Sequence, residues 1–228
     1  MESPVRRAFR LGYGGWRRIR NLALAVLLAS PAAAQEPATL VALGDSLTAG
    51  YGLAPEDGFV PRLADWLEGH GAQVEVRNAG VSGDTTAGGR ARLDWALGED
   101  ADAMIVALGG NDFLRGIDPA ESRENLRAIL QTARDRSVPV LLVGIDASSQ
   151  YGPDYEAAFD AMYPELGREF GVMVEPDFFA GLRRDGAGLA EARDRYLQPD
   201  GIHPNAEGVE RIVDQLGPRV LELLEAAR

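Results

Sequence analysis

Residues 103–112 read AMIVALGGND, and this stretch points most directly to the fold. The unbroken apolar run over residues 103–108 indicates a strand buried on both faces, as in a parallel sheet covered by helices. The glycines at 109 and 110 mark its end. Ligands of open parallel sheets bind beyond the carboxyl ends of the strands. Asn111 and Asp112 therefore fall where a functional site is expected.

The rest of the chain alternates short apolar runs with longer amphipathic segments. Further short strands are predicted at residues 39–43, 74–76, 138–143 and 172–174. Helical spacing of apolar residues occurs at 59–68, 90–97, 122–136, 155–170 and 205–227. Strands that alternate with helices predict one α/β domain with a parallel sheet between two helical layers. We find no internal repeat and no linker that would divide this domain.

Residues 1–34 have the pattern of a secretory signal peptide. Six arginines and one acid precede residue 35, and the apolar run LALAVLLAS at residues 22–30 leads into the small residues of Pro31–Ala34. The run is shorter than the roughly 20 apolar residues of a membrane anchor. We therefore expect cleavage after Ala34, a mature domain over residues 35–228, a periplasmic or secreted location and no stable membrane anchor.

The rarer residue types exclude several kinds of chemistry. The 228-residue chain has no Cys, and all 23 of its basic residues are Arg. Thiol nucleophiles, disulfides, Cys-ligated zinc, Schiff-base lysines, Ser–Lys dyads and P-loop lysines are therefore excluded. Only His70 and His203 can supply an imidazole. His70 follows a predicted helix within a polar stretch, where a histidine usually faces solvent or the helix dipole.

The predicted mature domain is strongly acidic. Residues 1–34 hold six of the 23 basic and one of the 35 acidic residues, which leaves 17 against 34 and a net charge of about −17. A polyanion is a poor partner for nucleic acid or for an anionic membrane. We therefore expect a small-molecule substrate and no nucleic-acid partner.

Ser46 lies in Gly44-Asp45-Ser46-Leu47, at the turn from the first predicted strand into a helix. A serine at such a turn can expose its hydroxyl as a nucleophile, and the helix N-terminus then favours negative charge nearby. Serine is also a common N-cap residue, so the loop alone fits either role.

A second stretch, LQPDGIHPN at residues 197–205, supplies a base of the kind that a serine nucleophile needs. Asp200 precedes His203 by three residues, and Pro199 and Pro204 stiffen the segment. The carboxylate can fold back onto Nδ1 of the imidazole, fix its tautomer and stabilise its charged form. The alternative is a surface Asx-turn beside an unrelated histidine.

Two other strand-end loops carry candidate donors for an oxyanion hole. Gly83 offers an unhindered backbone N–H and Asn111 a side-chain amide. Together with the Ser46 amide they would give three donors for the oxyanion of a tetrahedral intermediate. Taken singly, Gly83 and Asn111 also fit simple turns. The elbow motif of α/β-hydrolases, a Walker loop and a dinucleotide-binding fingerprint are all absent.

Four spaced blocks resemble those of the SGNH (GDSL) hydrolase superfamily. They are GDSL at 44–47, SGDT at 82–85, GGND at 109–112 and DGIHPN at 200–205. More narrowly, GDSLTAGYG, NAGVSGDTTAGG and GGNDFLRG resemble the group of periplasmic acyl-CoA thioesterases, lysophospholipases and arylesterases. The resemblance implies a flavodoxin-like three-layer α/β/α fold with five parallel strands and neither metal nor cofactor.

The same resemblance implies a role for each matched residue. Ser46 would be the nucleophile, His203 the base and Asp200 its orienting partner. The oxyanion hole would consist of the Ser46 amide, Gly83 and Asn111. The implied enzyme is a serine esterase that hydrolyses carboxylic esters and thioesters of acyl or aryl type through an acyl-enzyme, and we expect a monomer.

Two alternatives to that activity stay open at this point. A carbohydrate acetyl esterase could use the same scaffold, but it would need an open polar groove. A non-catalytic binding protein with a flavodoxin-like fold is the other alternative. Residues 144–150 and 183–193 depart from the resemblance, and we expect both segments to border the acyl pocket.

Overall fold

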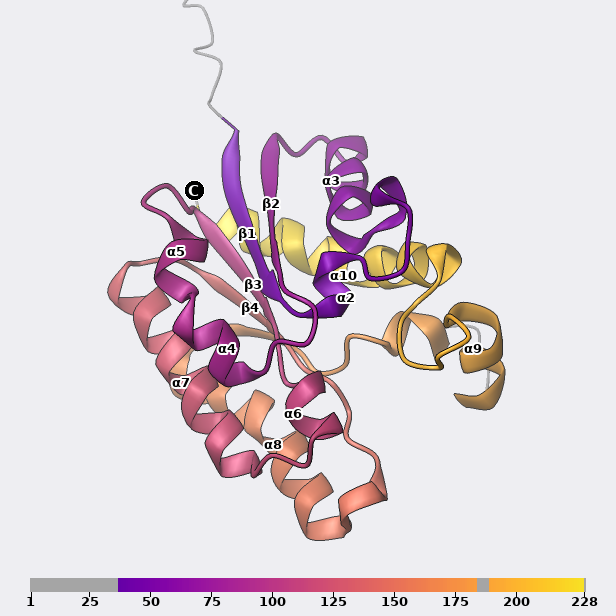
Figure 1. Ribbon diagram of the computed structural model, residues 1–228. Helices are drawn as coiled ribbons and strands as arrows, with labels where there is room; N and C mark the ends of the chain where they lie inside the picture. The colour runs from indigo at the N-terminus through magenta and orange to yellow at the C-terminus, as the bar shows by residue number, and fades with distance from the viewer. Residues whose placement is uncertain (1–36, 184–188, 228) are drawn as a thin grey trace, which may run out of the picture. The chain divides into compact units, whose positions relative to one another are not determined.

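The computed structural model describes residues 37–183 and 189–227. The predicted signal peptide, residues 1–34, lies outside them. The domain is built on five parallel strands in the order β2-β1-β3-β4-β5 (Figure 1). The strands are β1 (Ala38–Gly44), β2 (Val74–Gly80), β3 (Ala103–Ala107), β4 (Val140–Val143) and β5 (Met173–Glu175). The predicted α/β fold with a five-stranded parallel sheet is confirmed.

Helices cover both faces of this sheet (Figure 1). One face packs against α3 (Phe59–Gly69) and α10 (Ala206–Ala226). The other face packs against α5 (Leu93–Leu97), α7 (Pro119–Asp135) and α8 (Pro153–Phe170). Each of these helices has an apolar side that the sheet buries, which is why the helical spacing was visible in the sequence.

The strands supply the centre of both cores. Along β1, Leu40 and Ala42 face the α3 and α10 layer, whereas Val41 and Leu43 face the opposite layer. Successive side chains of a strand point to opposite faces, so a strand covered on both faces must be apolar throughout. Every residue of β3 is buried, which explains the unbroken run at residues 103–107.

The carboxyl ends of three neighbouring strands are in register. Gly44 of β1 pairs with Gly80 of β2 on one side and with Ala107 of β3 on the other. Since the strands are parallel, the loops that follow these three residues leave from one edge of the sheet. Close packing there requires glycine, because a Cβ on Gly80 would lie 2.4 Å from the backbone nitrogen of Ala49.

Several short helices were not predicted. They are α2 (Ser46–Ala49), η1 (Pro55–Asp57), α4 (Thr86–Ala91), α6 (Gly110–Leu114), η2 (Ser149–Tyr151), η3 (Ala180–Arg183) and α9 (Leu189–Tyr196). The helical segment predicted at residues 90–97 is divided between α4 and α5, and α4 begins earlier than predicted, because the Thr85 side chain caps it by accepting a hydrogen bond from the backbone nitrogen of Gly88. No helix within the described residues is long and apolar enough to cross a membrane.

Candidate active site

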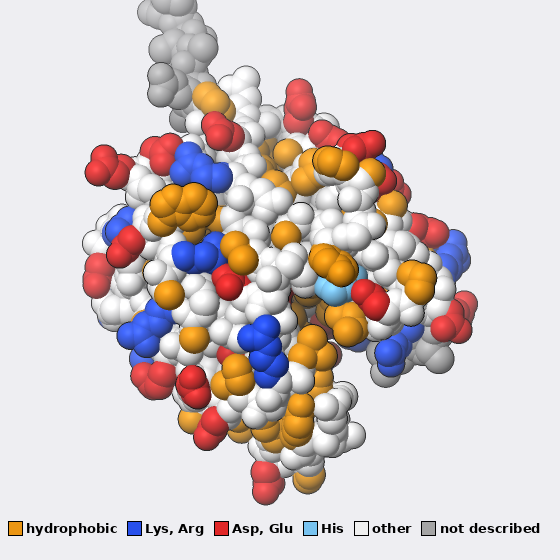
Figure 2. Space-filling model, in the orientation of Figure 1, with side chains coloured by type: hydrophobic (Ala, Val, Ile, Leu, Met, Phe, Trp, Pro, Cys, Tyr) orange, Lys and Arg blue, Asp and Glu red, His pale blue; other side chains and the backbone are white. Residues whose placement is uncertain are grey.

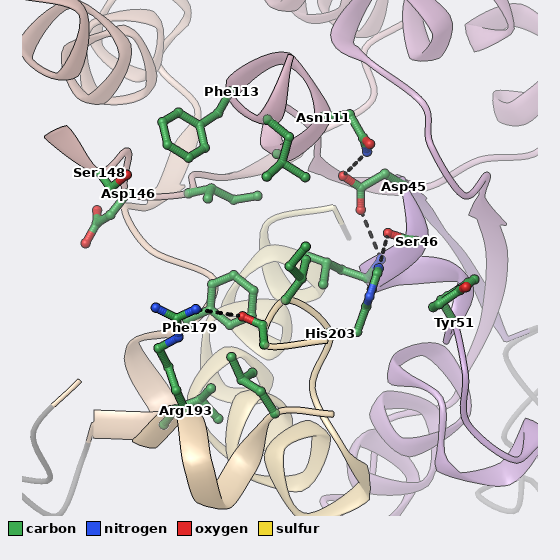
Figure 3. Close-up of a pocket in the computed structure, with 18 of the residues that line it drawn as sticks. Asp45, Ser46, Tyr51, Asn111, Phe113, Asp146, Ser148, Phe179, Arg193 and His203 are labelled. Carbon is green, nitrogen blue, oxygen red and sulfur yellow. Dashed lines mark hydrogen bonds between the residues drawn. The ribbon is translucent and has the colours of Figure 1, made fainter. Parts of the chain in front are cut away.

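Ser46 is the first residue of α2, directly beyond the end of β1. Asp45 is the N-cap of this helix, and its Oδ1 accepts a hydrogen bond from the backbone nitrogen of Leu47 at 3.0 Å. The capping role that the sequence left open for Ser46 therefore belongs to Asp45. The hydroxyl of Ser46 is left to face the cavity beyond the sheet edge (Figure 3).

Ser46, His203 and Asp200 form a continuous hydrogen-bonded chain. The Oγ of Ser46 lies 2.8 Å from Nε2 of His203, and Nδ1 of His203 lies 2.7 Å from Oδ2 of Asp200. With the proton of a neutral imidazole on Nδ1, that nitrogen donates to the carboxylate and Nε2 accepts from the serine hydroxyl. This is the geometry of a serine nucleophile with an oriented base.

Asp200 is held as a carboxylate by its surroundings. Hydrogen bonds from the His203 side chain, and then from the backbone nitrogens of Ile202 and His203, lower the pKa of Asp200 to about 2. Its Oδ1 accepts both backbone hydrogen bonds, at 2.9 and 3.0 Å, and Oδ2 is thus directed at the imidazole. The orientation of His203 is therefore built into the turn that precedes it.

Gln198 connects the histidine loop to the loop after α2. Its Nε2 donates to the carbonyl oxygens of Tyr51 at 2.8 Å and Pro204 at 3.0 Å, and its backbone nitrogen donates to the carbonyl of His203 at 2.7 Å. The ring of Tyr51 also lies over His203, with centroids 4.6 Å apart. These contacts hold His203 against the part of the chain that carries Ser46.

Gly83 and Asn111 line the same cavity as Ser46 and His203. Gly83 has a φ of +85°, a conformation that favours glycine, and its carbonyl accepts a hydrogen bond from Nη2 of Arg115 at 2.8 Å. Nδ2 of Asn111 donates to Oδ2 of Asp45 at 3.1 Å. An amide nitrogen has two protons, so one more donor of Asn111 is available.

Asp45 is a buried carboxyl group at the centre of the site, and it was not singled out in the sequence. Burial raises its pKa to about 6, although hydrogen bonds from Leu47 and Asn111 act in the opposite direction. Only 2% of the residue is exposed. Its acidic side chain therefore serves as a shared acceptor that ties the start of α2 to Asn111.

Arg92 is a second residue that sequence reasoning missed. Its guanidinium donates to the carbonyls of Gly44 and Ala79, each at 2.8 Å, and pairs with Asp84 at 2.6 Å. One side chain thus joins the ends of β1 and β2 to the loop that contains Gly83. The sequence offered no signal for this role, because an arginine in an amphipathic helix usually faces solvent.

Asp112 links α6 to its neighbours through a buried network. Its two oxygens accept from the backbone nitrogen and hydroxyl of Thr86, at 2.8 and 2.6 Å, and from the hydroxyl of Ser122 at 2.8 Å. These bonds fix the short helix that carries Asn111. Asp112 therefore supports the site without lining its cavity.

The cavity above Ser46 has a volume of about 610 Å³. Apolar side chains form much of its wall, among them Phe113, Ile145, Phe179, Leu182 and Leu197. Figure 2 shows apolar side chains along a hollow on this face of the molecule. Both segments that depart from the family resemblance border the cavity, as predicted: the described lining residues include Asp146 and Ser148 from one, and Arg183 and Arg193 from the other.

His70 lies away from this cavity. It follows the last turn of α3, where Nδ1 hydrogen-bonds to the carbonyl of Trp66 at 2.7 Å and the imidazole stacks on the Trp66 ring. This agrees with the expectation of a solvent-facing helix terminus. Within residues 37–183 and 189–227, no group of three or more His, Asp or Glu side chains could hold a metal ion.

Comparison with known proteins places this site in a family. Residues 42–211 match the model of the GDSL-like Lipase/Acylhydrolase family. The chain is 39% identical over 200 residues to Esterase TesA of Pseudomonas aeruginosa, an alignment that covers 87% of this chain and 94% of that protein. It is 36% identical to the Thioesterase 1/protease 1/lysophospholipase L1 of Escherichia coli K12, over 87% of this chain and 90% of that one.

A solved structure supports the same assignment. The SGNH-hydrolase family esterase AlinE4 superposes with a TM-score of 0.65 at 38% identity, over 82% of this chain and 97% of its own. The predicted resemblance and the prediction of an enzyme are confirmed. The chain belongs to the GDSL-like lipase/acylhydrolase family and is a GDSL-type hydrolase with the SGNH hydrolase fold.

Proposed function

We propose that this protein hydrolyses carboxylic esters and thioesters of acyl or aryl type through a covalent acyl-enzyme on Ser46. The observation that carries the proposal is the hydrogen-bonded chain from Ser46 Oγ through His203 to Asp200, at the wall of a largely apolar cavity. One of the two relatives is named an esterase and the other a thioesterase/lysophospholipase, which supports hydrolysis of both ester and thioester bonds.

In the first half-reaction, Ser46 Oγ attacks the substrate carbonyl while Nε2 of His203 takes its proton. The oxyanion that forms accepts hydrogen bonds from the Ser46 and Gly83 backbone nitrogens and from the Asn111 amide. As the tetrahedral intermediate collapses, His203 passes its proton to the departing alcohol or thiol. The acyl group remains on Ser46 as an ester.

In the second half-reaction, water replaces the leaving group. His203 removes a proton from the water, whose oxygen attacks the acyl-enzyme carbonyl, and the same donors hold the oxyanion. His203 then returns the proton to Ser46 Oγ, and the carboxylic acid leaves. Throughout both steps the Asp200 carboxylate stabilises the transient imidazolium.

The shape and chemistry of the cavity favour an apolar acyl or aryl group. The wall of the cavity is largely apolar, and the exposed side chains of Tyr51, Leu114 and Ile202 lie at its rim. Burying an apolar chain against such a surface is favourable by about 25 cal/mol per Å². A polysaccharide acetyl esterase would need a polar groove instead, so this alternative is disfavoured.

The decisive experiment compares the wild-type protein with Ser46→Ala and His203→Ala on short p-nitrophenyl esters. We expect turnover in the wild type and near-complete loss in both variants, with labelling of the wild type by a fluorophosphonate probe and none of Ser46→Ala. Retained turnover in either folded variant would overturn the assignment. Hydrolysis of palmitoyl-CoA and of acetyl-xylan, measured side by side, separates the acyl and carbohydrate alternatives.

Export belongs to the same proposal. A signal peptide over residues 1–34 with cleavage after Ala34 would deliver the domain to the periplasm or the medium, where acyl-CoA is scarce and carboxylic esters are the more accessible substrates. N-terminal sequencing of the protein recovered from the periplasm tests this point. The monomeric state also stays a prediction, which sedimentation or light scattering would check.

A further inference from the structure

Among the described residues, two arginines line the cavity, and they differ in how their charges are compensated. Arg183, at the end of η3, forms an ion pair with the buried Asp177 and lies 3.7 Å from Asp146. Its positive charge is therefore compensated by two carboxylates of the protein. It serves as part of the wall and has little capacity left for an anionic ligand.

Arg193, on α9, has no carboxylate partner among the described residues. Its Nη2 donates one long hydrogen bond, 3.4 Å, to the carbonyl oxygen of Gly201. Figure 3 shows its side chain extending from the helix towards the cavity. A guanidinium has five N–H donors in a planar fork, so most of the donors of Arg193 are available to a ligand.

Arg193 lines the same cavity as Ser46 and His203. Gly201, its contact, lies between Asp200 and His203 in the histidine loop. Arg193, Leu197 and Gly201 also form a wall shared with a second hollow of about 480 Å³, which is lined further by Asp194, Gln198 and Pro199. A substrate that extends past His203 along this wall would therefore come within reach of Arg193.

We propose that Arg193 is a cationic subsite for an anionic group, a phosphate or a carboxylate, that the substrate carries away from its scissile ester. The inference rests on the proposed function and adds a specificity determinant to it. A planar guanidinium matches both anions with two parallel hydrogen bonds. The anion can come from the leaving group, as in a phosphorylated alcohol, or from the far end of the acyl chain.

The charge of the whole domain makes such a subsite consequential. With an excess of acidic residues, the long-range field of the protein repels anions. Only a local, uncompensated cation can offset this repulsion at contact distance. Of the two described arginines that line the cavity, Arg193 is the one without a carboxylate partner among the described residues, so a preference for anionic substrates would depend on Arg193 more than on the general surface charge.

The test uses two matched pairs of substrates. One pair varies the leaving group, with monodecanoylglycerol and its phosphate ester, decanoyl lysophosphatidate. The other pair varies the acyl end, with p-nitrophenyl hexanoate and the p-nitrophenyl monoester of adipic acid. For each pair, the ratio of kcat/KM for the anionic over the neutral substrate is measured in the wild type and in Arg193→Gln, Arg193→Lys and Arg195→Gln.

Arg195→Gln is the matched control. Arg195 lies on the same helix, but it pairs with Glu207 at 2.9 Å and does not line the cavity. We expect Arg193→Gln to lower the ratio about fivefold or more in one pair, and the responding pair tells which end carries the anion. Arg193→Lys should retain part of the preference, whereas Arg195→Gln should leave both ratios near the wild-type value.

The proposal is overturned if Arg193→Gln leaves both ratios unchanged, or if Arg195→Gln lowers them as much. Salt provides a second readout, because raising the ionic strength from about 0.05 to about 0.5 M should narrow the difference between wild type and Arg193→Gln. If the wild type hydrolyses neither monodecanoylglycerol nor p-nitrophenyl hexanoate, the proposed function itself is refuted. This outcome is distinct from unchanged ratios in an active enzyme, which refute only the role of Arg193.

Discussion

Nδ2 of Asn111 donates a hydrogen bond to Oδ2 of Asp45 at 3.1 Å, and Oδ1 of the same carboxylate accepts from the backbone of Leu47. One buried carboxylate thus joins the proposed oxyanion donor of α6 to the first turn of α2, where Ser46 begins the helix. Both structural and kinetic consequences follow from this shared acceptor.

The first prediction concerns the positioning of Asn111. Asp45→Ser keeps an oxygen that can cap α2 but is too short to reach Asn111, whereas Asp45→Ala loses both contacts. Removing an oxyanion donor costs about 10²–10³ in kcat, so a misoriented amide should cost a substantial part of that in both variants, with KM little changed. Only Asp45→Ala should also lose about 1 kcal/mol of stability with its cap.

A double-mutant cycle with Asn111→Ala checks the mechanism, with kcat measured on p-nitrophenyl butyrate. If Asp45 acts through Asn111, then Asp45→Ser should reduce kcat much less in the Asn111→Ala background than in the wild type. Full additivity of the two losses would contradict the positioning role.

The raised pKa of Asp45 predicts a pH dependence of stability. Its pKa is about 6 in the folded protein against the ordinary value of 3.8 for an aspartate, so between these values the folded state binds more protons than the unfolded state. Stability should therefore fall as the pH rises from about 4 to about 6, by up to roughly 3 kcal/mol from this group. Asp45→Asn removes this contribution.

Urea unfolding of the wild type and Asp45→Asn, at several pH values between about 4 and 7, measures the effect. The free energy of unfolding of the wild type minus that of the variant should decline across this range. Other titrating groups cancel in this difference, so the decline reports on Asp45 alone. A difference that does not vary with pH would show that Asp45 is not protonated in the folded state at the acidic end.

A third prediction uses the turn around Asp200. In Asp200→Asn, the two backbone nitrogens of Ile202 and His203 that now bind Oδ1 would hold the amide oxygen, so the NH2 group would face Nδ1 of His203. Nδ1 must then accept a hydrogen bond, which moves the imidazole proton to Nε2. A protonated Nε2 cannot take the proton of Ser46. We expect kcat to fall about 10⁴-fold, the scale known for this substitution in a serine triad.

The measurement is kcat on a p-nitrophenyl ester, together with the thermal unfolding midpoint of the variant. The midpoint should stay near the wild-type value, since the Asp200 side chain is 37% exposed and the amide oxygen of the variant keeps both backbone hydrogen bonds. A folded Asp200→Asn variant with a kcat within tenfold of the wild type would be incompatible with Asp200 as the group that sets the tautomer.

The fourth prediction concerns the packing of α2 on the sheet edge. In Gly80→Ala the added Cβ would lie 2.4 Å from the nitrogen of Ala49 and 2.8 Å from the carbonyl carbon of Thr48. Backbone atoms cannot rotate away, so α2 must shift and Ser46 with it. We expect a loss of about 1–3 kcal/mol in stability and a lower kcat.

Gly69→Ala is the matched control, because no atom lies within 4 Å of its added Cβ at the exposed end of α3. It should leave kcat unchanged and should be neutral or slightly stabilising, by about 0.5 kcal/mol. Chemical unfolding and steady-state kinetics of both variants decide the matter. Equal effects of the two substitutions would show that the close approach at Gly80 is not a constraint.

The sequence by itself was sufficient to predict the helices and strands that bury a continuous apolar surface. The apolar run of β3 and the periodic faces of α3, α7 and α10 were visible because a two-sided sheet demands them. It also predicted the chemistry-bearing blocks, since Ser46, Asp200 and His203 occur in short motifs with local meaning. Asp200 binds His203 within one turn, so even this contact was accessible from the spacing.

The tertiary structure decided what depends on backbone pairing and long-range contact. The end of β2 reads Arg77-Asn78-Ala79-Gly80, so it carries no apolar run, and it pairs with β1 through its backbone. Asp45, Arg92 and Arg193 act on groups up to 66 positions away in the chain, and no local signal marks such partners. Burial raises the pKa of Asp45, and distance leaves Arg193 without a carboxylate partner among the described residues; both exist only once the chain has folded.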